Sequence, residues 1–172
     1  MPQLIVRTEV LIRAPAQRIW DLILDFENYP RWNPSIRRVR GHALPGEPAV
    51  LWVPLFPFGP CLPVHVIFFE VEPPLRLRWM GTLLVPALFC GDHRFILSPE
   101  EAGTIRLIQE ETFHGMLVPL LAPLLRRRLG RLFHQTSMVF KQLAESRDRP
   151  ATFPVKVGGP GEGRLRPDSS AG

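Results

Sequence analysis

The apolar residues of this chain follow two different spacings, and the order of these spacings limits the folds available to it. Residues 4–12 alternate well enough for a strand with one buried face. Residues 19–26 place apolar side chains at intervals of three and four, which predicts an amphipathic helix opened by Pro15. Residues 27–34 are turn-rich and predict a second short helix or a turn. Six further stretches predict strands, at 35–41, 49–53, 63–72, 75–83, 90–98 and 104–113.

Helical spacing returns near the end of the sequence. Between Leu121 and Leu143 apolar residues recur every three or four positions, which predicts one long helix that ends near Ser146. Pro119 and Pro123 either belong to its start or separate a short first segment from the main helix. Consecutive strands with short connections form an antiparallel sheet. We therefore expect an α+β fold in which a curved sheet wraps around one long helix and leaves a cavity between them.

Residues 48–69 form a strongly apolar segment of 22 residues without Asp, Glu, Lys or Arg. This length is enough to cross a bilayer as a helix, for which about 20 residues suffice. Five prolines lie inside the segment, however, and each costs a helix interior about 3 kcal/mol, so we expect it to be non-helical. Because the start of the chain also lacks a signal-peptide pattern, we expect a cytoplasmic protein without a transmembrane segment.

The length of 172 residues, with 45% apolar residues, fits one folded domain rather than a disordered chain. We expect this domain to cover residues 1–146, and the Pro- and Gly-rich residues 147–172 to form a disordered tail. Two cysteines, Cys61 and Cys90, are too few for a disulfide scaffold.

The formal charge of +5 is a weak indication of a nucleic-acid partner, and we expect none. Basic residues cluster in one place, at Arg126, Arg127, Arg128 and Arg131. Such a cluster is typical of the solvated face of a helix. Its alternative role is contact with phosphate or with an anionic membrane, so peripheral membrane contact stays open.

Several motifs, taken in order over residues 4–145, resemble those of the START/Bet v 1-like superfamily, also called SRPBCC or polyketide cyclase/dehydrase-like proteins. They read IRAP at 12–15, FENYPRWNP at 26–34, VEPPLRLRW at 71–79, GDHRF at 91–95 and ETFHG at 111–115. The resemblance implies the helix-grip fold, with two short helices after the first strand and a curved antiparallel sheet around a long C-terminal helix. This superfamily includes ligand carriers, aromatase/cyclases, and sterol- and quinone-binding proteins, so the resemblance is not specific to a reaction.

Alternation in the last predicted strand indicates which polar side chains enter the cavity. Ile105, Leu107 and Phe113 share one face, which we take as the face toward the cavity. Gln109 and Glu111 lie on the same face by the period of two.

The preceding strand contributes His93 to the same cavity, on the face of its apolar residues. We expect the turn between the two strands to pair Leu97 with Ile105. His93 then lies opposite Gln109 and one diagonal from Glu111. The three polar groups either form a satisfied hydrogen-bond network that orients a ligand, or include an acid and a base of an enzyme in His93 and Glu111.

The remaining candidates are mostly apolar side chains expected to line the cavity or its rim. The ligand-binding set is completed by Trp32, Trp52, Phe68, Trp79, Phe95, Leu107, Phe113, Leu132 and Thr136. Phe56 and Phe58, at a hairpin tip, are expected at the cavity rim, where they cap the cavity, dock a partner or touch a membrane. The alternative is that this loop folds back on its own sheet.

Other kinds of chemistry have little support in the sequence. The five histidines show no HxH or HExxH spacing, so we expect no metal. No serine lies in a Gly-x-Ser-x-Gly motif, and no glycine-rich phosphate loop is present. We therefore expect no cofactor.

Three functions remain. The preferred one is binding of a hydrophobic or amphipathic small molecule, lipid-, quinone- or polyketide-like, between the sheet and the last helix. The second is a cyclase or dehydratase in which His93 and Glu111 transfer protons. The third is a non-catalytic module that binds a protein or a membrane through the loop with Phe56 and Phe58.

Overall fold

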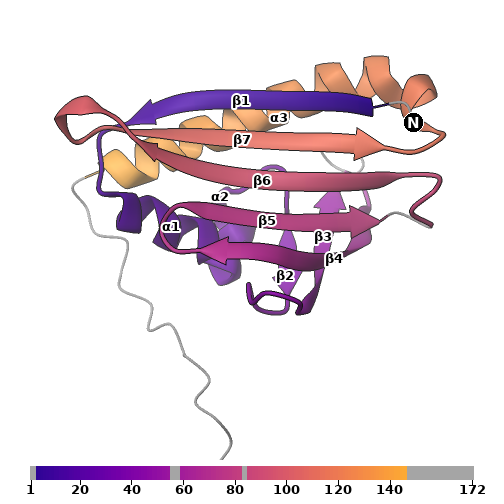
Figure 1. The fold of residues 1–172 in the computed structure, drawn as a ribbon, viewed down its shortest axis with the longest axis horizontal. Helices are drawn as coiled ribbons and strands as arrows, with labels where there is room; N and C mark the ends of the chain where they lie inside the picture. Colours follow the sequence, from indigo (N-terminus) through magenta and orange to yellow (C-terminus); the bar gives the residue numbers. More distant parts are fainter. Residues whose placement is uncertain (1–2, 55–58, 83–84, 147–172) are drawn as a thin grey trace, which may run out of the picture.

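In the computed structural model, residues 3–54, 59–82 and 85–146 are described. They form one seven-stranded antiparallel sheet and a long helix along one of its faces (Figure 1). The strands are β1 (Gln3–Ile12), β2 (Arg38–Arg40), β3 (Pro48–Pro54), β4 (Cys61–Glu72), β5 (Arg76–Thr82), β6 (Cys90–Pro99) and β7 (Ile105–His114). The helices are α1 (Ala16–Leu24), α2 (Tyr29–Trp32) and α3 (Val118–Glu145), with short 3-10 turns η1 (Phe26–Asn28) and η2 (Glu101–Gly103).

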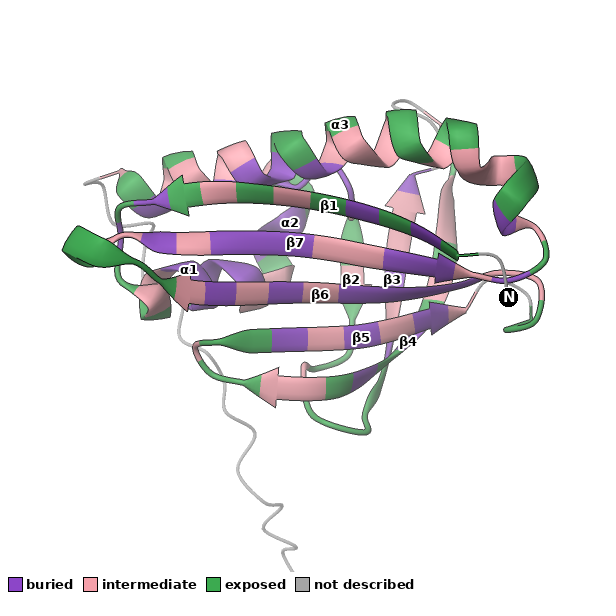
Figure 2. Ribbon diagram, turned by 45° about the horizontal axis from the view of Figure 1, so that its top comes forward, coloured by how far each residue is buried: buried purple, intermediate pink, exposed green. Residues whose placement is uncertain are grey.

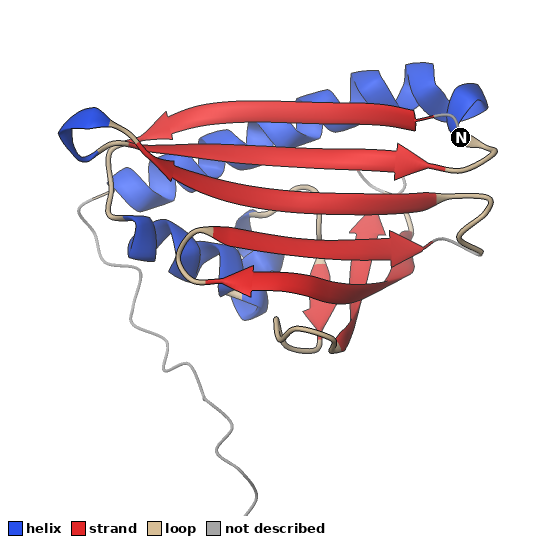
Figure 3. Ribbon diagram, in the orientation of Figure 1, coloured by secondary structure: helices blue, strands red, loops and turns tan. Residues whose placement is uncertain are grey.

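Strands that are neighbours in the sheet are also consecutive in the chain, with one exception. The order is β1-β7-β6-β5-β4-β3-β2, so the first strand lies beside the last. These two strands pair along their whole length, from Gln3 opposite His114 to Ile12 opposite Ile105. The helices α1, α2 and α3 lie on the same side of the sheet (Figure 3). This arrangement confirms the α+β helix-grip fold expected from the sequence.

The strand predicted over 35–41 is shorter in the structure, where β2 contains only Arg38–Arg40. The buried side chain of Asn33 explains the late start. Its Oδ1 accepts hydrogen bonds from the backbone N–H groups of Ser35 at 2.8 Å and Ile36 at 3.0 Å. These bonds turn the chain, so the two N–H groups are not available to a neighbouring strand.

The apolar segment 48–69 contains β3 and most of β4, which pair antiparallel with each other. The prediction that its prolines prevent a continuous helix is therefore confirmed. A bulge between Phe68 and Glu70 shifts the register of β4 against β5, and a bulge bends and twists the strand that contains it. Across the described ranges, no helix is long and apolar enough to cross a membrane.

The long helix α3 is continuous over 28 residues and includes both prolines. Pro119 lies in the first turn, where a backbone N–H has no partner within the helix. Pro123 lies inside the helix on an exposed side. The prolines thus belong to the start of the helix and do not split it. Figure 2 shows exposed residues along the outward side of α3.

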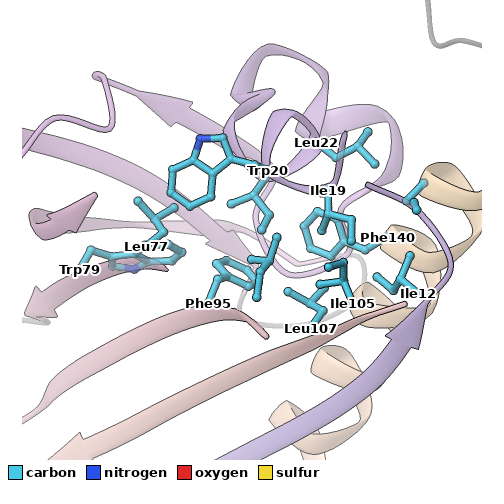
Figure 4. Close-up of a cluster of buried hydrophobic side chains, with 14 of the residues drawn as sticks. Ile12, Ile19, Trp20, Leu22, Leu77, Trp79, Phe95, Ile105, Leu107 and Phe140 are labelled. Atoms are coloured by element: carbon cyan, nitrogen blue, oxygen red, sulfur yellow. The ribbon is translucent and has the colours of Figure 1, made fainter. Parts of the chain in front are cut away.

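Buried apolar side chains from the sheet, α1 and α3 meet in one main core (Figure 4). The helical spacing predicted for residues 19–26 is confirmed, because α1 buries Ile19, Trp20, Leu22 and Ile23 in this core. A smaller core closes the space under the start of α3, and its buried members are Leu4, Val6, Phe113, Val118 and Phe133. Each fully buried side chain of this kind contributes about 1.5–3 kcal/mol. Residues 147–172, predicted to be a disordered tail, lie outside the described residues.

Candidate functional site

The polar candidates His93 and Glu111 lie directly opposite each other on β6 and β7. The predicted register of this hairpin is wrong by two residues, because Leu97 pairs with Leu107 and not with Ile105. A shift of two residues keeps every side chain on its face of the sheet. The expected convergence of polar groups is therefore preserved, although the direct partner of His93 is Glu111 rather than a glutamine.

The difference in register comes from the connection between the two strands. Both strands continue to the base of the loop, where Pro99 pairs with Ile105. The chain reverses between these two residues through Ala102 and Gly103, whose φ angles are +55° and +72°. A positive φ is common for glycine and rare for alanine, so the sequence gives no local signal for this tight loop.

Five polar side chains form a continuous hydrogen-bond chain through the interior. His93 Nδ1 lies 3.4 Å from Glu111 Oε2, and His93 Nε2 lies 3.5 Å from Gln109 Nε2. Ser137 of α3 donates to Gln109 Oε1 at 3.5 Å. The hydroxyl of Thr8 on β1 lies 3.3 Å from that of Ser137. This polar chain thus connects three adjacent strands with α3, through contacts of 3.3–3.5 Å that are longer than usual hydrogen bonds.

The donors and acceptors in this chain fit one direction. Ser137 has one proton, which it gives to Gln109, so Thr8 donates to Ser137. The amide N–H of Gln109 then donates to His93 Nε2, which leaves the proton of a neutral imidazole on Nδ1, facing Glu111. Every member has a partner in this assignment, as expected for a satisfied buried network.

Aromatic rings surround the imidazole of His93, which is only 5% exposed. The ring of Trp79 stacks on it at 4.3 Å between centroids, with an interplanar angle of 15°. Phe95 and Phe133 present their edges at 4.9 Å and 5.4 Å. The polar chain therefore crosses an apolar interior, where a hydrogen bond is stronger and an unpaired polar group costs more than in water.

Glu111 is the most exposed end of the chain, with a side chain that is 19% exposed against 6% for His93. Gly91 on β6 leaves room for its carboxylate, because a Cβ at that position would lie 2.6 Å from Glu111 Oε1. The nearby Cys90 is buried, and burial raises the pKa of its thiol. The thiol is thereby kept protonated, which makes it a poor nucleophile.

Most of the other predicted ligand-binding residues lie in the interior. Those whose rings or side chains belong to or pack against the main core are Trp32, Phe68, Trp79, Phe95 and Leu107. Phe113 belongs to the smaller core. Thr136 is buried on α3, and its hydroxyl lies 3.0 Å from that of Ser35, so this pair ties the helix to the segment before β2.

Two predicted residues lie outside this interior group, and the structure does not describe two others. Trp52 lies on the face of β3 opposite to Leu51, with the guanidinium of Arg38 5.3 Å from its ring centroid. Leu132 is half-buried and lines an open pocket beside α3. Phe56 and Phe58, predicted at the cavity rim, lie outside the described residues.

Sequence reasoning missed Thr8 and Ser137 as members of the polar chain. Both carried a signal, because each occupies a position that the periodicity assigns to a buried face. Thr8 falls in register with the apolar residues of the first strand. Ser137 lies four residues after Phe133 and three before Phe140, which are both buried on α3. A polar residue on an apolar face is the observation that would have pointed to them.

The interior gap next to the aromatic core is closed. It is lined by Phe26, Tyr29, Ile36, Val39, Leu51, Phe68 and Trp79, and it leaves no space for a water molecule. Any ligand that enters this region must displace side chains. No group of three His, Cys, Asp or Glu within the described part of the chain could hold a metal ion.

A sequence model of a protein family described as "Polyketide cyclase / dehydrase and lipid transport" matches residues 3–145. No curated protein sequence matches the chain.

Several solved structures share the fold at low sequence identity. The di-domain ARO/CYC StfQ from the steffimycin biosynthetic pathway has a TM-score of 0.68 and 14% identity, over 83% of this chain and 51% of its own. The di-domain ARO/CYC BexL from the BE-7585A pathway has a TM-score of 0.69 and 18% identity, over 85% and 51%. This chain spans about half the length of both proteins. A START superfamily protein from Mycobacterium smegmatis has a TM-score of 0.64 and 19% identity, over 82% and 97%.

Proposed function

The chain belongs to the polyketide cyclase/dehydrase and lipid transport family, and we propose that it binds a hydrophobic or amphipathic small molecule between the sheet and α3. The molecule would be lipid-, quinone- or polyketide-like. One observation carries the proposal: a polar chain that includes His93, Gln109 and Ser137 crosses an interior built mainly from aromatic and aliphatic side chains. Apolar surroundings with a few placed polar groups are typical of small-molecule sites.

The polar chain would orient the ligand. A ligand carbonyl could accept a hydrogen bond from the amide of Gln109, and a ligand hydroxyl could donate to the carboxylate of Glu111. Bonds of 3.4–3.5 Å at His93 are weak, so their replacement by a ligand group costs less than breaking a short hydrogen bond.

Binding at this site requires the aromatic side chains to rearrange, because the interior gap leaves no space for water. Trp79 both lines this gap and stacks on His93. A ligand that enters the gap would therefore change the surroundings of this indole, and we expect bound ligand to alter tryptophan fluorescence.

The direct test is native mass spectrometry of the freshly purified protein, together with a fluorescence titration with the neutral apolar probe N-phenyl-1-naphthylamine. We expect a co-purified molecule that is released on denaturation, or saturable probe binding by the empty protein. The proposal is wrong if the protein carries no bound molecule and binds the probe without saturation.

The orienting role of the polar chain can be tested with two ligands that differ in one carbonyl. We expect 2-acetylnaphthalene to displace the probe better than 2-ethylnaphthalene, and Gln109→Leu to reduce this preference by about tenfold, since one buried hydrogen bond is lost. Gln142→Leu, an exposed change on α3, is the matched control. Ser137→Ala, which removes the donor to Gln109 and the acceptor for Thr8, serves if Gln109→Leu does not fold. An unchanged preference in both variants would exclude the orienting role.

A second candidate function is acid–base catalysis of the cyclase or dehydratase type. The observation in its favour is the contact between His93 and Glu111, in which the carboxylate is the more exposed partner. The test is dehydration of a 3-hydroxyacyl N-acetylcysteamine thioester, followed by the absorbance of the conjugated product. His93→Ala and Glu111→Gln should each abolish turnover without lowering the melting temperature by more than a few degrees. If the wild-type protein shows no turnover, or both variants keep it, the pair has no catalytic role in this reaction.

A further inference from the structure

An open pocket with about 390 Å³ of space lies beside α3, away from the polar chain. One side is formed by Pro34 and Arg37, which precede β2, and another by Pro54 at the end of β3. The helix contributes Arg128, Arg131, Leu132 and Gln135. None of these residues lines the closed interior gap, so the pocket is a separate feature of the molecule.

The polar lining of this pocket is strongly basic. Three of its side chains are arginines, contributed by two separate parts of the chain, and none of the described lining residues is acidic. Arg128 Nη2 donates to the backbone oxygen of Pro54 at 2.8 Å, which joins the helix to the end of β3. Arg131 Nε donates to the backbone oxygen of Arg127 at 3.2 Å. These bonds hold two guanidinium groups at the wall of the pocket.

Within the described residues, the charges of Arg37 and Arg131 are not balanced by ion pairs of the kind that several sheet arginines form. Five arginines on β1, β5, β6 and β7 form salt bridges with carboxylates at 2.7–3.2 Å, and they are Arg7, Arg76, Arg78, Arg94 and Arg106. Among the described residues, no carboxylate forms a salt bridge with Arg37 or Arg131. The sequence reinforces the contrast, because residues 112–144 contain four arginines and one lysine but no Asp or Glu.

A concave site with several cations and no anion among its described lining residues attracts a ligand of the opposite charge. Guanidinium groups match phosphate and carboxylate oxygens in pairs, which makes arginine well suited to such groups. Leu132, Pro34 and Pro54 add apolar surface to the same walls. The pocket therefore fits an anion that also carries a hydrocarbon part.

We propose that this pocket binds the phosphate or carboxylate group of an anionic amphiphile, with Arg37 and Arg131 as its main ligands. This inference goes beyond the proposed interior site and does not depend on it. It also assigns a role to two members of the arginine cluster on α3, Arg128 and Arg131. The other two, Arg126 and Arg127, do not line the pocket.

The test is a calorimetric titration of the full chain with hexyl phosphate, inorganic phosphate and hexanol. We expect hexyl phosphate to bind more tightly than inorganic phosphate, and hexanol not to bind. Arg37→Gln and Arg131→Gln should each weaken hexyl phosphate binding by about tenfold, as expected for the loss of a charge-assisted hydrogen bond. The matched control is Arg126→Gln, which removes the same charge from an exposed position outside the pocket.

Four results would overturn the proposal. If Arg126→Gln weakens hexyl phosphate binding as much as the pocket variants do, the ligand is attracted by surface charge alone. If inorganic phosphate binds as tightly as hexyl phosphate, the hydrocarbon part of the ligand makes no contribution. Unchanged binding by the Arg37→Gln/Arg131→Gln double variant would place the anion elsewhere. Sedimentation with vesicles that contain phosphatidic acid separates the two sources of phosphate: binding to vesicles without binding to hexyl phosphate would show a membrane surface contact instead of a pocket.

Discussion

At the scale of single residues, the interior polar chain depends on one glycine as much as on its polar members. Gly91 has no side chain where the carboxylate of Glu111 lies, and the nearest oxygen would be 2.6 Å from a Cβ. That oxygen is the far end of a flexible side chain, so a larger residue would move the carboxylate rather than the sheet. The position of Glu111 next to His93 therefore depends partly on Gly91, which has no side chain that could bind a ligand or transfer a proton.

We predict that Gly91→Ala displaces the Glu111 carboxylate and lowers the free energy of unfolding by about 1 kcal/mol, the contribution of one hydrogen bond. The measurements are urea unfolding and the ¹⁵N shifts of the His93 ring, which report its tautomer. Gly130→Ala is the matched control, because a Cβ there meets nothing within 4 Å in a helix, where alanine is favoured by up to about 1 kcal/mol. A wild-type ring spectrum in Gly91→Ala would contradict the prediction.

The buried carboxylate of Asp92 lies on the opposite face of the sheet from its neighbour His93. Burial raises the pKa of Asp92, but hydrogen bonds from Arg78 and Arg94, each at 2.9 Å, outweigh it and hold the pKa below the ordinary value. A lowered folded-state pKa means that the charged carboxylate stabilises the fold above the ordinary carboxyl pKa. This stabilisation is lost as the pH falls through the folded-state value.

We therefore predict that Asp92→Asn lowers the free energy of unfolding by about 1–2 kcal/mol at neutral pH. The difference from the wild type should shrink as the pH falls below the ordinary carboxyl pKa of about 4, and it should disappear once the pH lies below the lowered folded-state pKa, where Asp92 is protonated in both states. Urea unfolding across this pH range measures the effect, with Glu47→Gln at an exposed position as the control. A difference that does not change with pH would mean that packing, and not charge, stabilises this position.

At the scale of elements, side-chain hydrogen bonds decide where the strands begin. The amide of Asn33 satisfies two backbone N–H groups that alternation alone would assign to a strand. The same segment carries Ser35, whose hydroxyl contacts Thr136 on α3, and Arg37, which lines the basic pocket. This turn therefore positions side chains for both the interior and the pocket.

We predict that Asn33→Ala lowers the free energy of unfolding by about 1–3 kcal/mol, because two buried N–H groups lose their acceptor. Thermal or urea unfolding measures the loss. Arg31→Ala, an exposed change in the short helix α2 that precedes Asn33, should remain within about 0.5 kcal/mol of the wild type. Equal stability of the two variants would show that water replaces the asparagine without cost.

At the scale of the whole molecule, the pairing of the first strand with the last joins the two ends of the folded chain. β1 and β7 are hydrogen-bonded over ten residue pairs, and α3 packs against the same two strands. The polar chain crosses this region too, since it links Thr8 with Ser137. Neither β1 nor α3 can detach from the rest of the molecule without breaking contacts in the sheet or the core together with the polar contact between Thr8 and Ser137.

We predict that the protein unfolds in one cooperative step. Tryptophan fluorescence, which includes Trp20 in α1 and Trp79 in β5, should give the same midpoint in urea as the loss of sheet seen by circular dichroism. Two separate midpoints would show that α1 and β5 unfold independently of the rest of the sheet.

Local patterns in the sequence predict the elements and their buried faces, because the periods of two and of three to four depend only on local backbone geometry. This is why His93, Gln109 and Glu111 were assigned correctly to one face even though their register was not. The five prolines of residues 48–69 likewise excluded a helix by local chemistry alone.

Which side chains contact one another depends on the packing of distant segments. The register between β6 and β7 depends on a loop with a left-handed alanine, and the contacts of Thr8 and Ser137 join residues 129 positions apart. The closed interior gap and the basic pocket depend on how α3 packs beside the turn before β2 and the end of β3. Such contacts join residues that are distant in sequence. The periodicity of one segment indicates its buried face, but it does not indicate which other segment packs against that face.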